Sequence, residues 1–104
     1  MRRATLILAL LLAGCNTSDA PRGDPVSGES LISEVEPSCG LCHTLAAAGF
    51  EGTAAPHLDI LQPGYQQVLD AVRSGPGLMP SYRNVLSEKE MHHIAAFVSG
   101  VAGE

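Results

Sequence analysis

The chain has 104 residues, 45% of them hydrophobic and 16% charged, with a formal net charge of −5 at pH 7. That length is enough for one small domain and too short for two. The six lysines and arginines form no basic patch, so nucleic-acid binding is not expected of this chain.

The amino terminus has the pattern of a secretory signal. Arg2 and Arg3 form a positively charged start, and residues 4–13 form an apolar run rich in leucine. This run is about half as long as the ~20 residues that a membrane-spanning helix requires. It leads into Leu-Ala-Gly-Cys, which resembles the lipobox of bacterial lipoproteins. The resemblance implies that residues 1–14 are removed and that Cys15 carries lipid; the alternative is an ordinary signal with a coincidental cysteine.

The segment after this cysteine is predicted to be a flexible linker. Residues 16–26 contain two prolines, one glycine and almost no apolar side chains, a composition too polar to join a core. We therefore expect residues 15–26 to form the lipidated amino terminus and linker, and residues 27–104 to form one domain. Loss of the two signal arginines takes the formal charge to −7.

The residue after the lipidated cysteine helps to sort lipoproteins between the two membranes of Gram-negative bacteria. Asn16 is not the aspartate that usually retains such proteins in the inner membrane, which favours the outer membrane. The resemblance therefore implies an exported protein, anchored by lipid on the periplasmic side.

The first helix of the domain is predicted from Ser27 to about Glu36. Leu31, Ile32 and Val35 recur within it at helical spacing. Pro37 limits how far this helix can run, because proline lacks the backbone N–H that a helix interior needs.

The next feature along the chain is the sequence Cys-Gly-Leu-Cys-His, which matches the C-x-x-C-H haem-attachment signature. Cys39 and Cys42 are spaced to form thioethers with both vinyl groups of one haem, and His43 can then ligate the iron. A covalent haem would also add a large apolar component to a core with few aromatic residues. The alternatives are a redox-active dithiol, which lacks the βαβ pattern, a zinc site, which lacks a second cysteine pair, or a chance match.

The middle helix is predicted over residues 64–74, followed by the stop signal Gly-Pro. Its stripe of apolar positions consists of Tyr65, Val68, Leu69 and Val72.

A methionine follows in a loop rich in glycine and proline, just before the last helix. Met79 is the expected sixth ligand of the iron, because its thioether is soft and Pro80 stiffens the loop that presents it. The alternatives are packing of Met79 on the ring edge, an open site, or ligation by another side chain. The candidates for that role are His57, Met91, His92 and His93, of which His57 is the most credible because it lies in a loop.

The last helix is predicted over residues 87–99. It begins with the capping box Ser-Glu-Lys-Glu, and Gly100 is expected to end it. Met91, Ile94, Ala95 and Val98 form its apolar stripe, flanked by Phe97. No segment shows the alternation of a strand, so the domain is predicted to be all-α with extended loops.

The order of these motifs from Ser27 to the carboxyl terminus resembles a small bacterial class I cytochrome c. The resemblance implies three to four helices around one haem c, with Gly28 crossing the last helix near Ile94 and Phe97. It also implies that the Pro56 carbonyl accepts a hydrogen bond from His43 Nδ1. Two departures are Leu31, where the family usually has an aromatic residue, and the absence of a basic ring of lysines.

The expected function is transfer of single electrons, with no enzymatic activity of its own. A haem ligated on both faces leaves no open position, and the scattered carboxylates form no acid–base pair. The acidic charge predicts redox partners that present positive charge. The alternatives are a haem-based sensor or small peroxidase with a displaceable sixth ligand, and a subunit of a larger membrane oxidoreductase.

Overall fold

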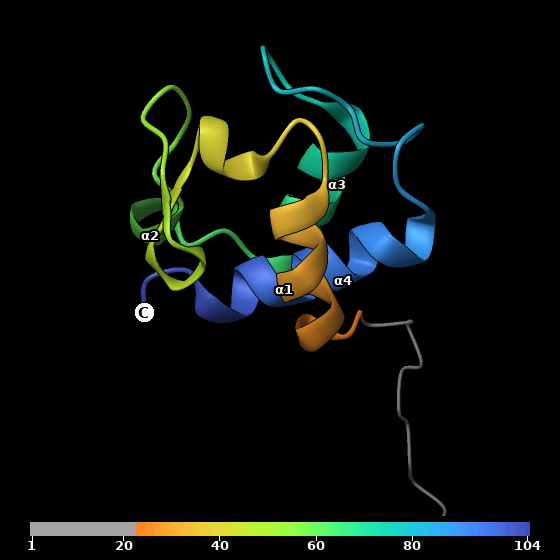
Figure 1. Ribbon diagram of the computed structural model, residues 1–104, viewed down its shortest axis with the longest axis horizontal. Coiled ribbons are helices and arrows are strands. Elements are labelled where there is room, and N and C mark those ends of the chain that lie inside the picture. Colours follow the sequence, from red (N-terminus) through yellow and green to blue (C-terminus); the bar gives the residue numbers. More distant parts are fainter. Residues whose placement is uncertain (1–22) are drawn as a thin grey trace, which may run out of the picture.

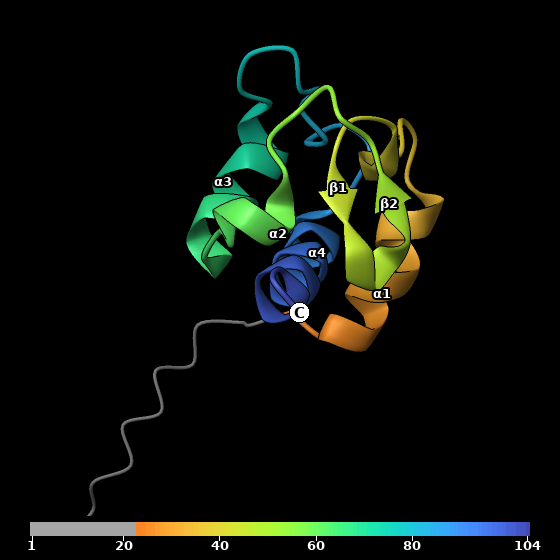
Figure 2. The ribbon, with the colours of Figure 1, turned by 90° about the vertical axis from the view of Figure 1, so that its left-hand side faces the viewer.

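The computed structural model describes residues 23–104. The predicted signal of residues 1–14, the lipidation site Cys15 and the linker up to residue 22 lie outside the described residues. Besides two short 3-10 helices, residues 23–104 form four α-helices and one short hairpin (Figures 1 and 2), so the predicted helical fold is confirmed. Their bounds are α1 Pro25–Glu34, β1 Thr44–Leu45, β2 Phe50–Glu51, α2 Leu58–Leu61, α3 Tyr65–Ser74 and α4 Glu88–Val101.

Helix α1 begins two residues earlier than predicted. The Asp24 side chain caps it by accepting hydrogen bonds from the N–H groups of Val26 and Ser27. Pro25 fits the first helical position, where a missing N–H costs nothing. The structure thus places residues 23–26 in the folded domain rather than in the linker.

Helices α1 and α4 cross at close range, as Figures 1 and 2 show. A Cβ atom on Gly28 would lie 2.0 Å from the carbonyl oxygen of His93 and 2.8 Å from Cβ of Phe97. The predicted contact of Gly28 with Phe97 is therefore present, and the tightest approach is to the backbone of His93 rather than to Ile94. Only a residue without a side chain lets the two helices approach this closely.

The ends of α3 and α4 follow the signals in the sequence at three of four places. Gly64 precedes α3, Gly75 ends it in the left-handed conformation (φ 65°), and the predicted capping box is present at Ser87. The prediction that Gly100 ends α4 is wrong. The helix continues to Val101, because one glycine weakens a helix by only about 1 kcal/mol and the packed turns before it hold the backbone.

The core lies where α1, α3 and α4 meet, and the predicted stripes of α3 and α4 face it. The largest fully buried side chains are Ile32, Leu45, Leu69 and Met91. Leu45 belongs to the hairpin of β1 and β2, which pairs Thr44 with Glu51. The hairpin and the four-residue α2 were not predicted as elements, because segments this short carry no readable periodicity.

Within residues 23–104, no helix is long and apolar enough to cross a membrane.

Candidate haem-binding site

The main cavity of the described domain has a volume of about 550 Å³. That size falls within the usual range for a small-molecule or cofactor pocket. A second hollow of about 160 Å³ adjoins it and shares much of its lining. The residues common to both are Cys39, His43, Ala54, Ala55, Leu78 and Met79. The structure therefore brings the predicted attachment cysteine and both predicted axial ligands to one place.

The C-x-x-C-H segment forms one tight turn, a 3-10 helix over Cys39–Leu41. The Ser38 hydroxyl caps it by accepting the Gly40 N–H at 3.3 Å, and the His43 N–H donates to the Cys39 carbonyl at 2.9 Å. This turn brings the backbone of His43 back to that of Cys39, so the two side chains reach the same cavity. Cys42 lines only the smaller of the two hollows, whereas Cys39 lines both.

The two thiols of this turn have different surroundings. Cys39 is half-buried and Cys42 is exposed, and no disulfide joins them. Burial raises the pKa of the Cys39 thiol to about 11. A redox-active dithiol instead needs a thiolate stabilised at neutral pH, so these surroundings disfavour that alternative.

The loop after the turn holds the predicted proximal histidine in a fixed orientation. Nδ1 of His43 lies 2.8 Å from the carbonyl oxygen of Pro56, which is the contact expected at this position. The loop is tied back by the Ala55 N–H, which donates to the Cys42 carbonyl at 2.9 Å, and by the Gly52 N–H, which donates to the His43 carbonyl at 3.1 Å. The remaining ring nitrogen, Nε2, is left to act as a ligand.

The loop that carries Met79 is anchored to the end of α3. Gly75 and Gly77 adopt left-handed backbone angles of 65° and 59°, which turn the chain sharply. The Met79 N–H donates to the Pro76 carbonyl at 3.0 Å, and the Tyr82 N–H donates to the Val72 carbonyl at 2.9 Å. These bonds hold the methionine at the wall of both hollows.

The other candidate ligands lie elsewhere. His57 is exposed at the start of α2 and does not line either hollow. Met91 is 1% exposed in the core, while His92 and His93 take part in contacts with the amino-terminal end of the domain. Within the described residues, no three histidine, cysteine, aspartate or glutamate side chains gather as a metal site.

Several apolar residues of the site were not identified from the sequence. Leu78 is fully exposed and Leu61 is 48% exposed, and both border the main cavity. Leu58, Pro63 and Gln67 also line it. The exposed leucines fit a site that takes a large flat apolar group, since such a group would cover them. In the sequence, these leucines can be noticed only as apolar side chains that lie outside any predicted helical stripe.

Comparison with known proteins adds two findings. The family described as cytochrome C oxidase, cbb3-type, subunit III, matches residues 23–98. A crystal structure of the c-type cytochrome SorU from Sinorhizobium meliloti is 41% identical in sequence, with a TM-score of 0.73. That match covers 76% of this chain and 91% of the other. None of the curated proteins matches the chain.

Proposed function

Because this chain belongs to the family described as cytochrome C oxidase, cbb3-type, subunit III, and is a small class I c-type cytochrome with covalent haem c, we propose a specific carrier role for it. It transfers single electrons between redox proteins at a membrane surface. Cys39 and Cys42 bind the haem, and His43 and Met79 are its axial ligands.

The observation that supports this role most directly is the shared lining of the two hollows. His43 and Met79 both border each hollow, so a group that fills the hollows would meet both side chains. When bound, the haem supplies an iron that cycles between the ferrous and ferric states. Two protein ligands leave no position for a substrate, and the chain then acts by passing an electron on.

The residues around the ligands set their properties. The Pro56 carbonyl accepts the Nδ1–H of His43, which fixes the tautomer and makes Nε2 a better electron donor. The thioether of Met79 is a softer ligand than a second imidazole and favours the reduced state, which raises the reduction potential. Thioether bonds to Cys39 and Cys42 would attach the haem covalently, so that it could not dissociate during electron transfer.

Replacement of Met79 by alanine tests the assignment of the distal ligand. The variant should lose the weak long-wavelength absorption band of the oxidised protein, which reports sulfur bound to iron. Its reduction potential should fall, and carbon monoxide should bind the reduced protein readily.

The matched control is Met91→Leu, which alters a buried methionine of α4 that lines neither hollow. This variant should keep the band and resist carbon monoxide. If the wild type already binds carbon monoxide rapidly and Met79→Ala changes nothing, the distal ligand is wrong and a sensor or peroxidase role gains support.

A second candidate role is that of a subunit within a larger membrane oxidoreductase. The description of the matching family, which names an oxidase subunit, favours this role. The two roles differ in what surrounds the protein in the membrane. Extraction in mild detergent followed by native electrophoresis would give haem staining at the size of the single chain for a free carrier, and at the size of a complex for a subunit.

The proposed location is the periplasmic side of a membrane, with lipid on Cys15 as the anchor. The lipobox-like sequence supports the anchor, and Asn16 favours the outer membrane of a Gram-negative cell. The formal charge of −7 after removal of the signal supports partners that present positive charge.

A further inference from the structure

The amino-terminal end of the described domain lies directly on the backbone of α4. A Cβ atom on Gly23 would lie 2.0 Å from the carbonyl oxygen of His92 and 2.3 Å from the amide nitrogen of His93. No side chain fits there, because these atoms belong to the backbone of a packed helix and cannot move aside. Gly23 is therefore seated on the peptide that joins two adjacent histidines.

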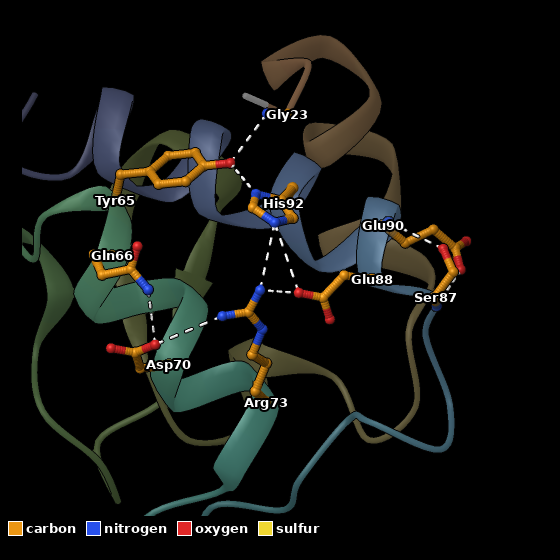
Figure 3. A network of polar contacts seen from close by, with 9 residues as sticks. All are labelled: Gly23, Tyr65, Gln66, Asp70, Arg73, Ser87, Glu88, Glu90 and His92. Carbon is orange, nitrogen blue, oxygen red and sulfur yellow. Dashed lines mark hydrogen bonds and ion pairs between the residues drawn. The ribbon is translucent and has the colours of Figure 1, made fainter. Parts of the chain in front are cut away.

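Two backbone hydrogen bonds hold this end of the chain. The Asp24 N–H donates to Nδ1 of His93 at 2.7 Å, and the Gly23 N–H donates to Oη of Tyr65 at 3.1 Å. Figure 3 shows the tyrosine oxygen between Gly23 and the ring of His92, whose Nδ1 is 2.5 Å away. The Asp24 N–H thus bonds to one histidine ring of α4, and the Gly23 N–H bonds to the tyrosine that contacts the other histidine ring.

The pattern of donors requires the His93 ring to be neutral. A ring nitrogen accepts a hydrogen bond only when it carries no proton, so His93 holds its single proton on Nε2. Tyr65 accepts the Gly23 N–H on its oxygen and shares a second hydrogen bond with Nδ1 of His92, in which either group can be the donor. Protonation of Nδ1 of His93 places two donors face to face, because the Asp24 N–H cannot turn away or accept.

The charges around His92 oppose a proton on it. The Arg73 guanidinium of α3 is 3.5 Å from Nε2, and the Glu88 carboxylate of α4 is 3.7 Å from the same atom (Figure 3). Glu88 is already paired with Arg73, which also contacts Asp70. Burial, then Arg73 and His93, lower the pKa of His92 below its usual 6.5. The stabilisation from the neutral ring is therefore present above pH 6.5 and is lost as the pH falls through the lowered value.

The charges around His93 give a protonated ring no free partner. The nearby Asp24 carboxylate already accepts the first N–H groups of α1. One turn earlier on α4, the Glu90 carboxylate is held by the capping box, and Lys89 carries positive charge. The amino-terminal end of α1 is also the positive end of its helix dipole. A charged His93 is attracted to the Asp24 carboxylate but can no longer accept the Asp24 N–H.

We propose that these contacts form an acid-sensitive clamp on Gly23 and Asp24, which opens when His93 becomes protonated. The clamp consists of Gly23, Asp24, Tyr65, His92 and His93. Figures 1 and 2 place the start of α1 on the side of α4 away from the loop that carries Met79. The closed clamp therefore fixes Gly23 and Asp24 on the side of α4 away from the haem-binding site, and opening releases these two residues from α4. The clamp does not depend on the proposed electron carrier role or lipid anchor.

Amide hydrogen exchange, followed by NMR on the haem-loaded protein, tests the clamp between pH 8 and pH 5. Protection factors, which correct for the intrinsic effect of pH on exchange, should fall for the Gly23 and Asp24 amides. The expected fall is about fivefold for each hydrogen bond lost. The amide of Ala95, in the buried part of α4, should keep its protection. In the wild type, the midpoint of the fall at Asp24 should match the titration of the His93 ring, which NMR records in the same samples.

Three variants separate the clamp from a general loss of stability. His93→Asn offers an acceptor oxygen that does not titrate, so protection of Asp24 should become equal at pH 5 and pH 8. His57→Asn alters an exposed histidine remote from the clamp and should keep the wild-type response. Gly23→Ala should leave the clamp open at both pH values. Equal protection at both pH values in the wild type would overturn the proposal, as would a mismatch between the two midpoints or an unchanged acid response in His93→Asn.

Discussion

At the scale of single residues, the turn that carries Cys39 and Cys42 explains how one short motif can attach a haem. The turn from Cys39 to Leu41 exposes Cys42 and leaves Cys39 half-buried beside the cavity. Gly40 is needed between them, because a Cβ there would lie 2.4 Å from Cδ1 of Phe50. The ring of Phe50 thus packs against the turn that carries both cysteines.

Replacement of Cys39 and Cys42 by serine should remove the covalent link. Haem should stay with the wild-type chain through denaturation and acid–acetone extraction, and should be lost from the double variant. The double variant should also be poorly folded, because the core would lose its largest apolar component. Cys15→Ser is the control and should retain haem. Extraction of haem from the denatured wild type would show that the thioether assignment is wrong.

Asp59 is the residue that most directly connects stability to pH at the carboxyl-terminal end of the fold. Its Oδ1 accepts the Gly103 N–H at 2.9 Å, and its Oδ2 accepts the Ala46 N–H at 2.8 Å. These bonds, that of Gly103 first, lower the pKa of Asp59 below the usual 3.8. Its stabilisation is therefore complete above pH 3.8 and is lost as the pH falls through the lowered value.

Replacement of Asp59 by asparagine should lower the thermal midpoint at neutral pH and reduce its further fall in acid. The amide oxygen can accept only one of the two backbone donors, and it does not titrate. Thermal unfolding followed by circular dichroism over a pH series measures both effects. Glu51→Gln, at an exposed site on β2, is the control and should follow the wild-type curve. If Asp59→Asn follows it as well, the carboxylate makes no pH-dependent contribution.

At the scale of elements, the crossing of α1 over α4 organises the domain. Gly28 lets the two helices approach until the His93 carbonyl would meet a Cβ at 2.0 Å. The same stretch of α4 receives Gly23, which lies five residues before Gly28 in the chain. Two glycines of the amino-terminal region therefore pack on one turn of α4, and this turn fixes where the domain begins.

Gly28→Ala and Gly100→Ala should have opposite effects on the free energy of unfolding. The added methyl at Gly28 would push the helices apart and should destabilise the protein by about 1–3 kcal/mol, more than the gain in helix propensity. Gly100 also lies within a helix, but no atom lies within 4 Å of a Cβ there. Its replacement should stabilise the protein by roughly 0.5–1 kcal/mol. Urea denaturation of the haem-loaded proteins measures both; a destabilised Gly100→Ala, or a neutral Gly28→Ala, would contradict this account of the crossing.

At the scale of the whole molecule, the proposed anchor and the domain are joined by a short segment. The structure adds residues 23–26 to the domain, which leaves residues 16–22 between Cys15 and the fold. Those seven residues reach at most about 25 Å when fully extended. If lipid on Cys15 is the anchor, a partner must meet the domain close to the membrane.

Cys15→Ala should release the haem domain from the membrane if lipid on that cysteine is the anchor. Stable anchoring takes two or more acyl chains, and the variant would carry none. Cell fractionation with haem staining measures the distribution, and mass spectrometry of the wild type measures the lipid. Cys15→Ala found wholly in the membrane fraction, together with a wild type without lipid, would reject the anchor.

The sequence alone determined the features that depend on neighbouring residues. The capping box at Ser87, the left-handed stop at Gly75 and the turn of the C-x-x-C-H motif are each built by a few residues close in the chain. The apolar stripes of α3 and α4 predicted which faces of those helices are buried. Such features are readable because their energies come from local hydrogen bonds and from a repeated pattern of apolar side chains.

Only the tertiary structure decided the features that depend on segments far apart in the chain. Asp24 and Gly23 look like linker residues until α4, some seventy residues later, provides the surface and the His93 acceptor that order them. Gly100 looks like a helix stop, yet packing of the preceding turns carries α4 past it. The apolar wall beside Met79 likewise joins α2, α3 and two loops. Free energy from such contacts exists only once the chain has brought the distant parts together, so no stretch of sequence displays it by itself.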